Sequence, residues 1–468
     1  MSQTPTLSIL TICNPSAIST EKWPRFPPKL RNLKYELSQD KNYYLNHPNK
    51  INDPVKDLRH CTKLQSLDIK SSFIDHRFSD YSISLKRLAL QTGFPSDSSL
   101  RNFHRLESIH FTINSLSDLK NICASLSKLP SLQEISLEPR GLSAVDLSTH
   151  LKQITSEAKS FKKLQLIIEC ALSFTTFGIS NGSGRPHILK TLENFHKLTH
   201  LSLALSISSD FFVGSILEGI RNQSRLQYLK LRIINGMHFE HHTTLQLLCK
   251  EISTLSQLQH LKLSFQGNYI PHGHKLENFL LDLDPVFNKP VKIKTFSLEC
   301  NQLSPGEVYF ELVHMLESLK NSLEKLKVDI GGYCFQKKEH SAVISFFKSL
   351  VNIRELYLPG VWISDKKFLN DFTETVLQYK YLRVLNIGII KSTVTKPAFY
   401  LAIDAILKKR GLEGFQYWVQ DDFMDTLKAK SKTDRKMNLV QVRRENPSLE
   451  DMPHYPLLFE DDISDVNW

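Results

Sequence analysis

The sequence predicts an α/β solenoid with a curved parallel sheet on its concave face and helices on its convex face. Three observations lead to this fold class: a short leucine motif recurs along most of the chain, its copies are almost regularly spaced, and helical patterns fill the segments between them. One strand and one helix cannot bury their apolar faces alone, so neighbouring repeats must stack. We therefore expect one elongated array, although 468 residues would otherwise suggest about three ordinary domains.

The recurring motif has the form LxxLxL. Clear copies begin at residues 64, 85, 106, 132, 161, 198, 226, 258, 293, 323, 353 and 382, and weaker ones at residues 7, 30 and 412. From residue 64 to residue 412 the successive copies lie 21 to 37 residues apart. The alternation of apolar and polar residues in the second half of the motif is typical of a short strand with one buried face.

The segments between the motifs carry helix signals. "SPGEVYFELVHMLESLK" begins with Ser304 as the expected N-cap and Pro305 at the first helical position. "SDKKFLNDFTETVLQYK" begins with Ser364, and "KPAFYLAIDAILKKRG" is expected to end at Gly411 after basic residues in its last turn.

This pattern resembles the leucine-rich repeat family, whose longer motif is LxxLxLxxNxL. Two repeats match the extension, one with Asn114 and Leu116 and the other with Asn301 and Leu303. Most repeats are 28 to 35 residues long, and in this they are similar to the long, helix-backed repeats of ribonuclease-inhibitor-like proteins. The resemblance implies a leucine-rich repeat solenoid, an architecture that does not by itself specify a function.

The domain organisation follows from where the motif is clear. We expect an N-terminal cap with repeat-like strands over residues 1–60, a solenoid over 61–420 and a tail over 421–468. The segment "GISNGSGRPH", residues 178–187, lacks the GK[ST] of a phosphate-binding loop and is expected to be a surface insertion.

Charge is distributed unevenly between the body of the chain and its end. The net charge is +11, and the segment from Arg443 to Trp468 has two basic and seven acidic residues, which gives −5 there and +16 for the rest. A basic body favours an acidic partner. The tail, which combines acids with aromatic residues, is expected to be disordered or loosely docked, and its contact with the basic body is one hypothesis.

The cysteines and the apolar runs of the sequence indicate in which cellular compartment the protein is expected. The seven cysteines are widely scattered and form no CxxC, which predicts reduced thiols in a cytoplasmic or nuclear protein. The N-terminus lacks the basic region of a secretory signal, and no apolar run reaches the ~20 residues that span a bilayer.

The motif also predicts which residues bind a partner. Its positions 1, 4 and 6 point into the core, so positions 3, 5 and 7 face the concave side. In the repeats at 161, 198, 226 and 258 none of these concave positions is acidic, and the first acid downstream is Glu299. The predicted partner-binding residues, hereafter the concave patch, are Lys163, His200, Tyr228, Lys230, Arg232, His260 and Lys262. The alternative is that these long, solvated side chains tolerate one another and the patch binds nothing.

Histidines in two neighbouring loops are candidates for a metal site. The loop after the strand at 226 has His238, His241 and His242, and the next has His272 and His274. Imidazoles suit zinc, copper or nickel. No family motif fixes this spacing, so solvated loops are the preferred interpretation, and we expect no metal and no cofactor.

The sequence favours a binding function over catalysis. It has no GxSxG, no HExxH and no nucleotide loop, so we expect a non-catalytic scaffold or adaptor that binds an acidic protein partner. Nucleic-acid binding through the basic concave face is the first alternative, although arginines and stacking aromatics are sparse there. A regulator of the F-box or RanGAP-like kind is the second, and no residue here matches a catalytic loop of that kind.

Overall fold

The fold is taken from a computed structural model of the chain, which divides into two compact units. Unit 1 comprises residues 1–303 and 314–322, and unit 2 comprises 304–313 and 323–468. Each is described by itself. The structure describes residues 9–13, 29–36, 61–70, 84–90, 103–113, 115–126, 129–139, 150, 162–168, 197–206, 220–221, 223–234, 242–266, 286–287, 292–300, 313, 316–329, 333–334, 340–358, 361–362, 366–389 and 396–419.

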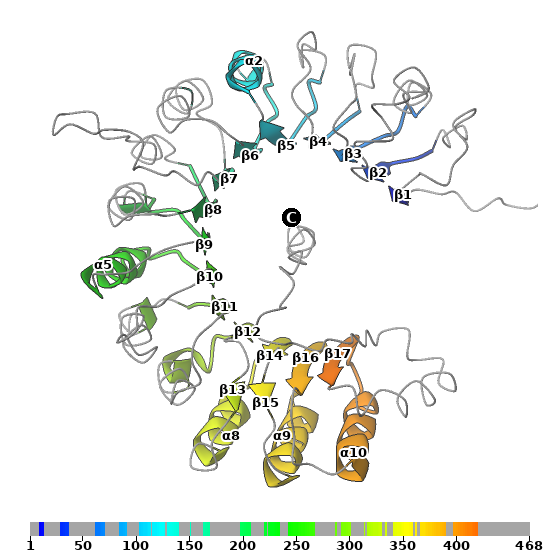
Figure 1. The fold of residues 1–468 in the computed structure, drawn as a ribbon, viewed down its shortest axis with the longest axis vertical. Coiled ribbons are helices and arrows are strands. Elements are labelled where there is room, and N and C mark those ends of the chain that lie inside the picture. The colour runs from blue at the N-terminus through cyan, green and yellow to red at the C-terminus, as the bar shows by residue number, and fades with distance from the viewer. Residues whose placement is uncertain are drawn as a thin grey trace, which may run out of the picture. The chain divides into compact units, whose positions relative to one another are not determined.

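The strands of unit 1 form a parallel sheet in which each strand pairs with the next one along the chain. They lie along an arc (Figure 1). The strands are β1 (Ile9–Cys13), β2 (Asn32–Glu36), β3 (Ser66–Lys70), β4 (Arg87–Leu90), β5 (Ser108–Ile113), β6 (Glu134–Pro139), β7 (Lys163–Ile168), β8 (His200–Ser206), β9 (Tyr228–Ile234), β10 (His260–Gln266) and β11 (Thr295–Cys300).

The leucine motif produces these strands in the same way each time. In the repeat that contains β9, Leu226, Leu229 and Leu231 are buried. The N–H of Leu226 donates to the carbonyl of Gln223 at 3.0 Å and closes the turn before the strand. The same i to i−3 bond precedes β3, β5, β6 and β10. Because the leucines fix the phase of each strand, every repeat turns the same motif positions into the core.

A shared carbonyl joins one repeat to the next. The carbonyl of Thr199 accepts the N–H groups of Gln227 and Tyr228, at 2.8 and 3.0 Å. The carbonyl of Gln227 in turn accepts those of Gln259 and His260, at 2.8 and 2.9 Å. This contact fixes the stagger of adjacent repeats where each strand begins, so the residues of one motif position form a continuous column across the sheet.

The α-helices α2 (Leu116–Leu126) and α5 (His242–Ser253) lie on the outer side of the arc (Figure 1). Unit 1 also contains the short 3-10 helix η7 (Glu317–Leu319). The inward side of α2 buries Leu119, Ile122, Cys123 and Leu126. Apolar residues at this spacing cover the outer side of the sheet and give the unit its core.

Unit 2 repeats the same architecture with better-defined helices. Its strands β12 (Lys325–Asp329), β14 (Glu355–Leu358), β16 (Val384–Ile389) and β17 (Gly414–Val419) pair in parallel in that order. The two-residue strands β13 (Tyr333–Cys334) and β15 (Val361–Trp362) pair separately. The helices α8 (His340–Ser349), α9 (Lys366–Gln378) and α10 (Lys396–Leu407) lie side by side (Figure 1).

Phenylalanines fill the core between the helices of unit 2. Phe347 of α8 meets Phe372 of α9 edge to face, with ring centroids 5.6 Å apart, and Phe368 stacks on Phe372 at 6.3 Å. Just beyond α9, the buried Tyr379 donates its hydroxyl proton to the carbonyl of Phe347 at 2.8 Å. That bond satisfies a polar group that would otherwise destabilise the core.

Both units therefore form an α/β leucine-rich repeat solenoid, with parallel strands on one side and helices on the other. The helix expected after Ser364 is α9, and the one expected to end at Gly411 is α10. Its predicted end was wrong, because α10 stops at Leu407 and Gly411 lies in the following turn with φ of +85°. Glycine suits this left-handed conformation because it has no Cβ.

Several expectations fall outside the described residues. These are the insertion at 178–187, the caps at Ser304 and Ser364, and the whole tail 421–468 with its proposed contact to the basic body. Within the expected cap, β1 and β2 pair in parallel with each other and β2 pairs with β3. The domain boundaries at 60 and 420 stay predictions.

Candidate functional site: the concave patch

The strand register places the residues of the concave patch in neighbouring columns on β7 to β10. Lys163 pairs with His200, His200 with Tyr228, and Tyr228 with His260. In the next column Lys230 pairs with Lys262. Arg232 follows in the third column, with Ala204 on one side and Ser264 on the other. The predicted grouping of these seven residues on one part of the sheet is thus present in the structure.

Three rings form a ladder in the first column. The rings of His200 and Tyr228 stack with centroids 5.6 Å apart and an interplanar angle of 26°. Tyr228 and His260 are 6.2 Å apart and tilted by 37°. The ring of Tyr228 therefore lies between two imidazoles, each contributed by a neighbouring strand.

Threonine hydroxyls hold the two imidazoles in place. Nδ1 of His200 lies 2.8 Å from Oγ1 of Thr199, and Nδ1 of His260 lies 2.9 Å from Oγ1 of Thr295. The single hydroxyl proton of Thr199 is directed at the carbonyl of Lys162, so we infer that Nδ1–H of His200 donates to Thr199. The leucine motif assigns both histidines to the concave side. It does not reveal their hydroxyl partners, because Thr199 occupies a different motif position and Thr295 lies on the neighbouring strand β11.

His200 is neutral at physiological pH. Burial, followed by the positive charge of Lys163 and by His260, lowers its pKa from 6.5 to about 4. Burial likewise lowers the pKa of Lys163, against the raising effect of Glu134 on β6. The positive charge of the patch consequently comes from its lysines and its arginine, while His200 acts as a neutral polar group.

Two lysines are opposed in the second column. Lys230 is half-buried, whereas Lys262 is only 7% exposed. The ammonium of Lys262 lies 5.7 Å from the centroid of the Tyr228 ring, within the range of a cation–π contact. Like charges directly opposite each other on paired strands destabilise a sheet. The ring of Tyr228 offsets part of that cost for Lys262.

Acidic residues border the patch on both sides. On β6, Glu134 pairs with Lys163, and Glu138 lies in the third column, where it accepts a hydrogen bond from Thr112 at 3.3 Å. On β11, Glu299 pairs with Ser264. The downstream border was expected from the sequence. The upstream border on β6 was not, although Glu134 and Glu138 occupy motif positions 3 and 7 there.

Accessibility decreases along the patch toward β10 and β11. Most described concave residues on β7, β8 and β9 are half-buried, namely Lys163, His200, Ser202, Tyr228, Lys230 and Arg232, and Ala204 is buried. On the next two strands His260 is half-buried, whereas Lys262, Ser264, Thr295, Ser297 and Glu299 are all buried. The surface that a partner reaches most easily is therefore the part on β7 to β9.

The histidines considered for a metal site fall largely outside the described residues. His238, His241, His272 and His274 are among these, and of the five only the backbone of His242 is described, as the first residue of α5. Within the described ranges, no group of three or more His, Cys, Asp or Glu side chains is placed to hold a metal ion.

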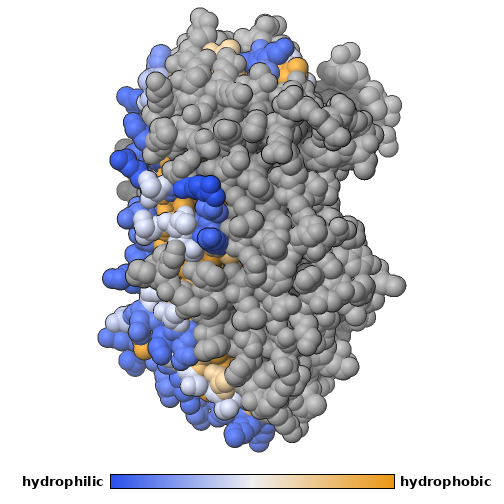
Figure 2. All heavy atoms as spheres, turned by 90° about the vertical axis from the view of Figure 1, so that its left-hand side faces the viewer, coloured by the Kyte–Doolittle hydropathy of each residue, from blue (hydrophilic) through white to orange (hydrophobic). Residues whose placement is uncertain are grey.

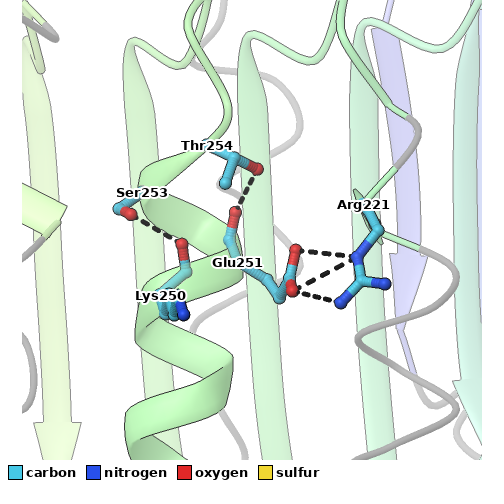
Figure 3. Close-up of polar contacts among 5 residues, drawn as sticks. All are labelled: Arg221, Lys250, Glu251, Ser253 and Thr254. Carbon is cyan, nitrogen blue, oxygen red and sulfur yellow. Dashed lines mark hydrogen bonds and ion pairs between the residues drawn. The ribbon is translucent and has the colours of Figure 1, made fainter.

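The outer side of unit 1 has a different character. Arg221 and Glu251 of α5 form a forked ion pair, with Nη2 2.5 Å from Oε1 and Nε 3.2 Å from each carboxylate oxygen (Figure 3). The bond from Arg221 lowers the pKa of Glu251. On the face of the chain drawn in Figure 2, the described residues are mostly hydrophilic, with small apolar areas between them. No described helix is both long and apolar enough to cross a membrane.

Comparisons with known proteins find likeness at the level of structure. No family model and no curated protein matches the sequence. Among solved structures, an internalin of Listeria monocytogenes has 12% identity and a TM-score of 0.31, covering 87% of this chain and 86% of that one. A leucine-rich repeat protein of Leptospira interrogans has 16% identity and a TM-score of 0.36, covering 91% and 94%.

TLR13 in its complex with a single-stranded RNA has 13% identity and a TM-score of 0.39, covering 84% of this chain and 53% of that one. At such identities these likenesses concern the fold alone, and with such TM-scores they add nothing to the description of the site. The repeat itself and the parallel register of its strands identify the chain as a leucine-rich repeat solenoid.

Proposed function

We propose that the chain is a non-catalytic scaffold or adaptor that binds an acidic segment of a protein partner on the concave patch. The observation that supports this most directly is the strand register, which gathers Lys163 of β7, Lys230 and Arg232 of β9, and Lys262 of β10 between acidic borders. Such a field attracts an anionic partner, and the borders restrict where it docks.

The energetics of the patch favour an anionic partner. Keeping Lys230 opposite Lys262 costs stability in the unbound protein. A carboxylate placed between them turns a repulsion into two attractions, and Tyr228 adds an amphipathic ring at the centre of the contact.

The repeats of unit 2 each carry a well-formed helix, and we propose on this ground that the array is of the ribonuclease-inhibitor-like type.

Nucleic-acid binding is the alternative that one observation favours, because the ladder of His200, Tyr228 and His260 offers rings beside lysines. The arrangement of the ladder argues against it. One face of Tyr228 is already occupied by the stacked ring of His200, and His260 and the ammonium of Lys262 adjoin the same ring, whereas single-stranded nucleic acid binds by stacking bases on open aromatic faces. The protein partner is therefore the preferred proposal.

The location proposed for the protein is the cytoplasm or the nucleus. Cys61, Cys123 and Cys249 are all buried, and burial raises the pKa of Cys61. Buried cysteines with little thiolate character behave as small apolar core residues and suit a reducing compartment.

The test is capture of partners from native lysate, with and without nuclease treatment, on the intact protein and on a variant with Lys230, Arg232 and Lys262 all changed to Glu. A matched control changes three exposed lysines of unit 2, Lys366, Lys367 and Lys380, to Glu. We expect one protein with an acidic segment on the wild type and on the control, in both lysates, and its loss on the concave variant.

Two results would overturn the proposal. If the concave variant still folds and captures the same proteins as the wild type, the patch is only a solvated face. If capture disappears on nuclease treatment, the patch binds nucleic acid. In that case binding must also weaken steeply with salt, because each neutralised phosphate releases a counterion.

A further inference from the structure

The concave patch has a low strip on β8. Among β7 to β10, β8 is the strand that has small residues in both the second and the third column, Ser202 and Ala204. The register places Ser202 beside Lys230 and Ala204 beside Arg232. Two long basic side chains on β9 therefore adjoin a strip where the side chains are short.

The geometry of paired strands sets the size of a group that fits there. Adjacent strands lie ~4.8 Å apart, so a group seated over Ser202 comes within ion-pair distance of the side chains on β9. Ser202 is half-buried and Ala204 is buried, so the accessible floor of the strip is the Ser202 side chain. Its hydroxyl is a suitable donor to an anionic oxygen.

His200 defines the chemistry at the near end of the strip. It lies on β8 two residues before Ser202, and its lowered pKa keeps it neutral at physiological pH. The strip is thus bounded by a neutral ring at one end and by an ammonium and a guanidinium along one side. A carboxylate suits such a place, because a charge-assisted bond to Arg or Lys is roughly twice as strong as a neutral one.

We propose that the acidic partner is anchored by one carboxylate side chain seated on the strip over Ser202, against Lys230 and Arg232. This inference rests on the proposed function and specifies which part of the concave patch carries the affinity. The rest of the patch then contributes attraction over distance and little direct contact, as expected for residues around an interface hot spot.

The first experiment fills the strip without changing any charge. A fluorescein-labelled oligoglutamate peptide is titrated against the wild type, Ser202→Leu, Ser202→Ala and Lys230→Glu, with folding checked by circular dichroism. Leucine should weaken binding about tenfold, or about 1.4 kcal/mol, by displacing the carboxylate, whereas alanine keeps the strip low and should change affinity less than about twofold.

A second pair of variants keeps the proposal testable if leucine disturbs the fold. Ser202→Asp places a fixed carboxylate in the strip and should weaken peptide binding about tenfold. The control Ser108→Asp, on β5, changes the net charge by the same amount at a half-buried concave position outside the patch, and it should bind nearly as well as the wild type.

The outcomes separate this inference from the proposed function. If Lys230→Glu weakens binding while neither Leu nor Asp at residue 202 does, the strip is not the anchor, and the broader proposal stands. If Ser108→Asp weakens binding as much as Ser202→Asp, only the net charge matters, and the anchor is likewise refuted. If Lys230→Glu binds the peptide as the wild type does, the proposed function itself fails.

Discussion

Lys230→Glu should make the protein more stable while it weakens partner binding. Lys230 and Lys262 are directly paired across β9 and β10, and the buried position of Lys262 limits how well water screens the pair. An opposite-charge cross-strand pair stabilises a sheet by roughly 0.2–1 kcal/mol, and a like-charge pair destabilises it. Exchanging one for the other should therefore raise the free energy of unfolding by about 1 kcal/mol.

The assay is urea unfolding followed by circular dichroism, at low salt and at about 0.5 M NaCl, where screening shortens the range of the interaction. Lys327→Glu is the matched control, since Lys327 is half-buried on β12 and pairs with Tyr357 rather than with another lysine. We expect a stabilisation for Lys230→Glu that shrinks with salt, and none for the control. Equal destabilisation by both variants would show that Lys230 and Lys262 do not repel each other and would refute the reasoning.

Three further outcomes follow from single contacts. Because the pKa of His200 is lowered to about 4 in the folded protein, the unfolded chain binds the proton at a higher pH than the folded chain does. The free energy of unfolding should therefore fall as the pH drops from 6.5 toward 4, and His200→Asn should remove this pH dependence in unfolding experiments. Arg221→Gln should raise the pKa of Glu251 and lower the free energy of unfolding by up to about 1 kcal/mol at neutral pH. The Arg221–Glu251 pair stabilises the folded state only while the Glu251 carboxylate is ionised. The difference between variant and wild type should therefore vanish as the pH falls through the folded-state pKa of Glu251. Tyr379→Phe should cost about 1 kcal/mol by removing one of the two hydrogen bonds that the Phe347 carbonyl accepts, the other coming from the N–H of Leu350, and an unchanged urea midpoint would contradict that contribution.

Much of the fold was predictable because the leucines fix the phase of each strand. Once Leu226, Leu229 and Leu231 are assigned to the core, Tyr228 and Lys230 must face the other way. The stacking of repeats then determines which residues become neighbours, so the columns of the concave patch follow from the sequence. The end of α10 does not follow from the sequence in this way, because a glycine is compatible with either a helix end or a turn. The helix ends at Leu407, and it is the following turn that requires Gly411 for its positive φ.

The chemical state of the patch could not be read from the motif. The neutrality of His200 depends on how deeply it is buried and on Lys163, which comes from another repeat. The burial of Lys262 and the contact of His260 with the hydroxyl of Thr295 on β11 also arise from three-dimensional packing. Sequence therefore predicts where the site is, and the structure adds which of its groups carry charge.

Site-specific photo-crosslinking tests the central claim most directly. A benzophenone amino acid replaces Tyr228 on the concave side or, as the control, Lys250 on α5, and crosslinked partner peptides are identified by mass spectrometry. We predict that position 228 crosslinks to an acidic segment of one protein and that position 250 does not. Crosslinks to the same protein from position 250 alone would place the binding surface on the helices and contradict the proposal that the concave patch binds the partner.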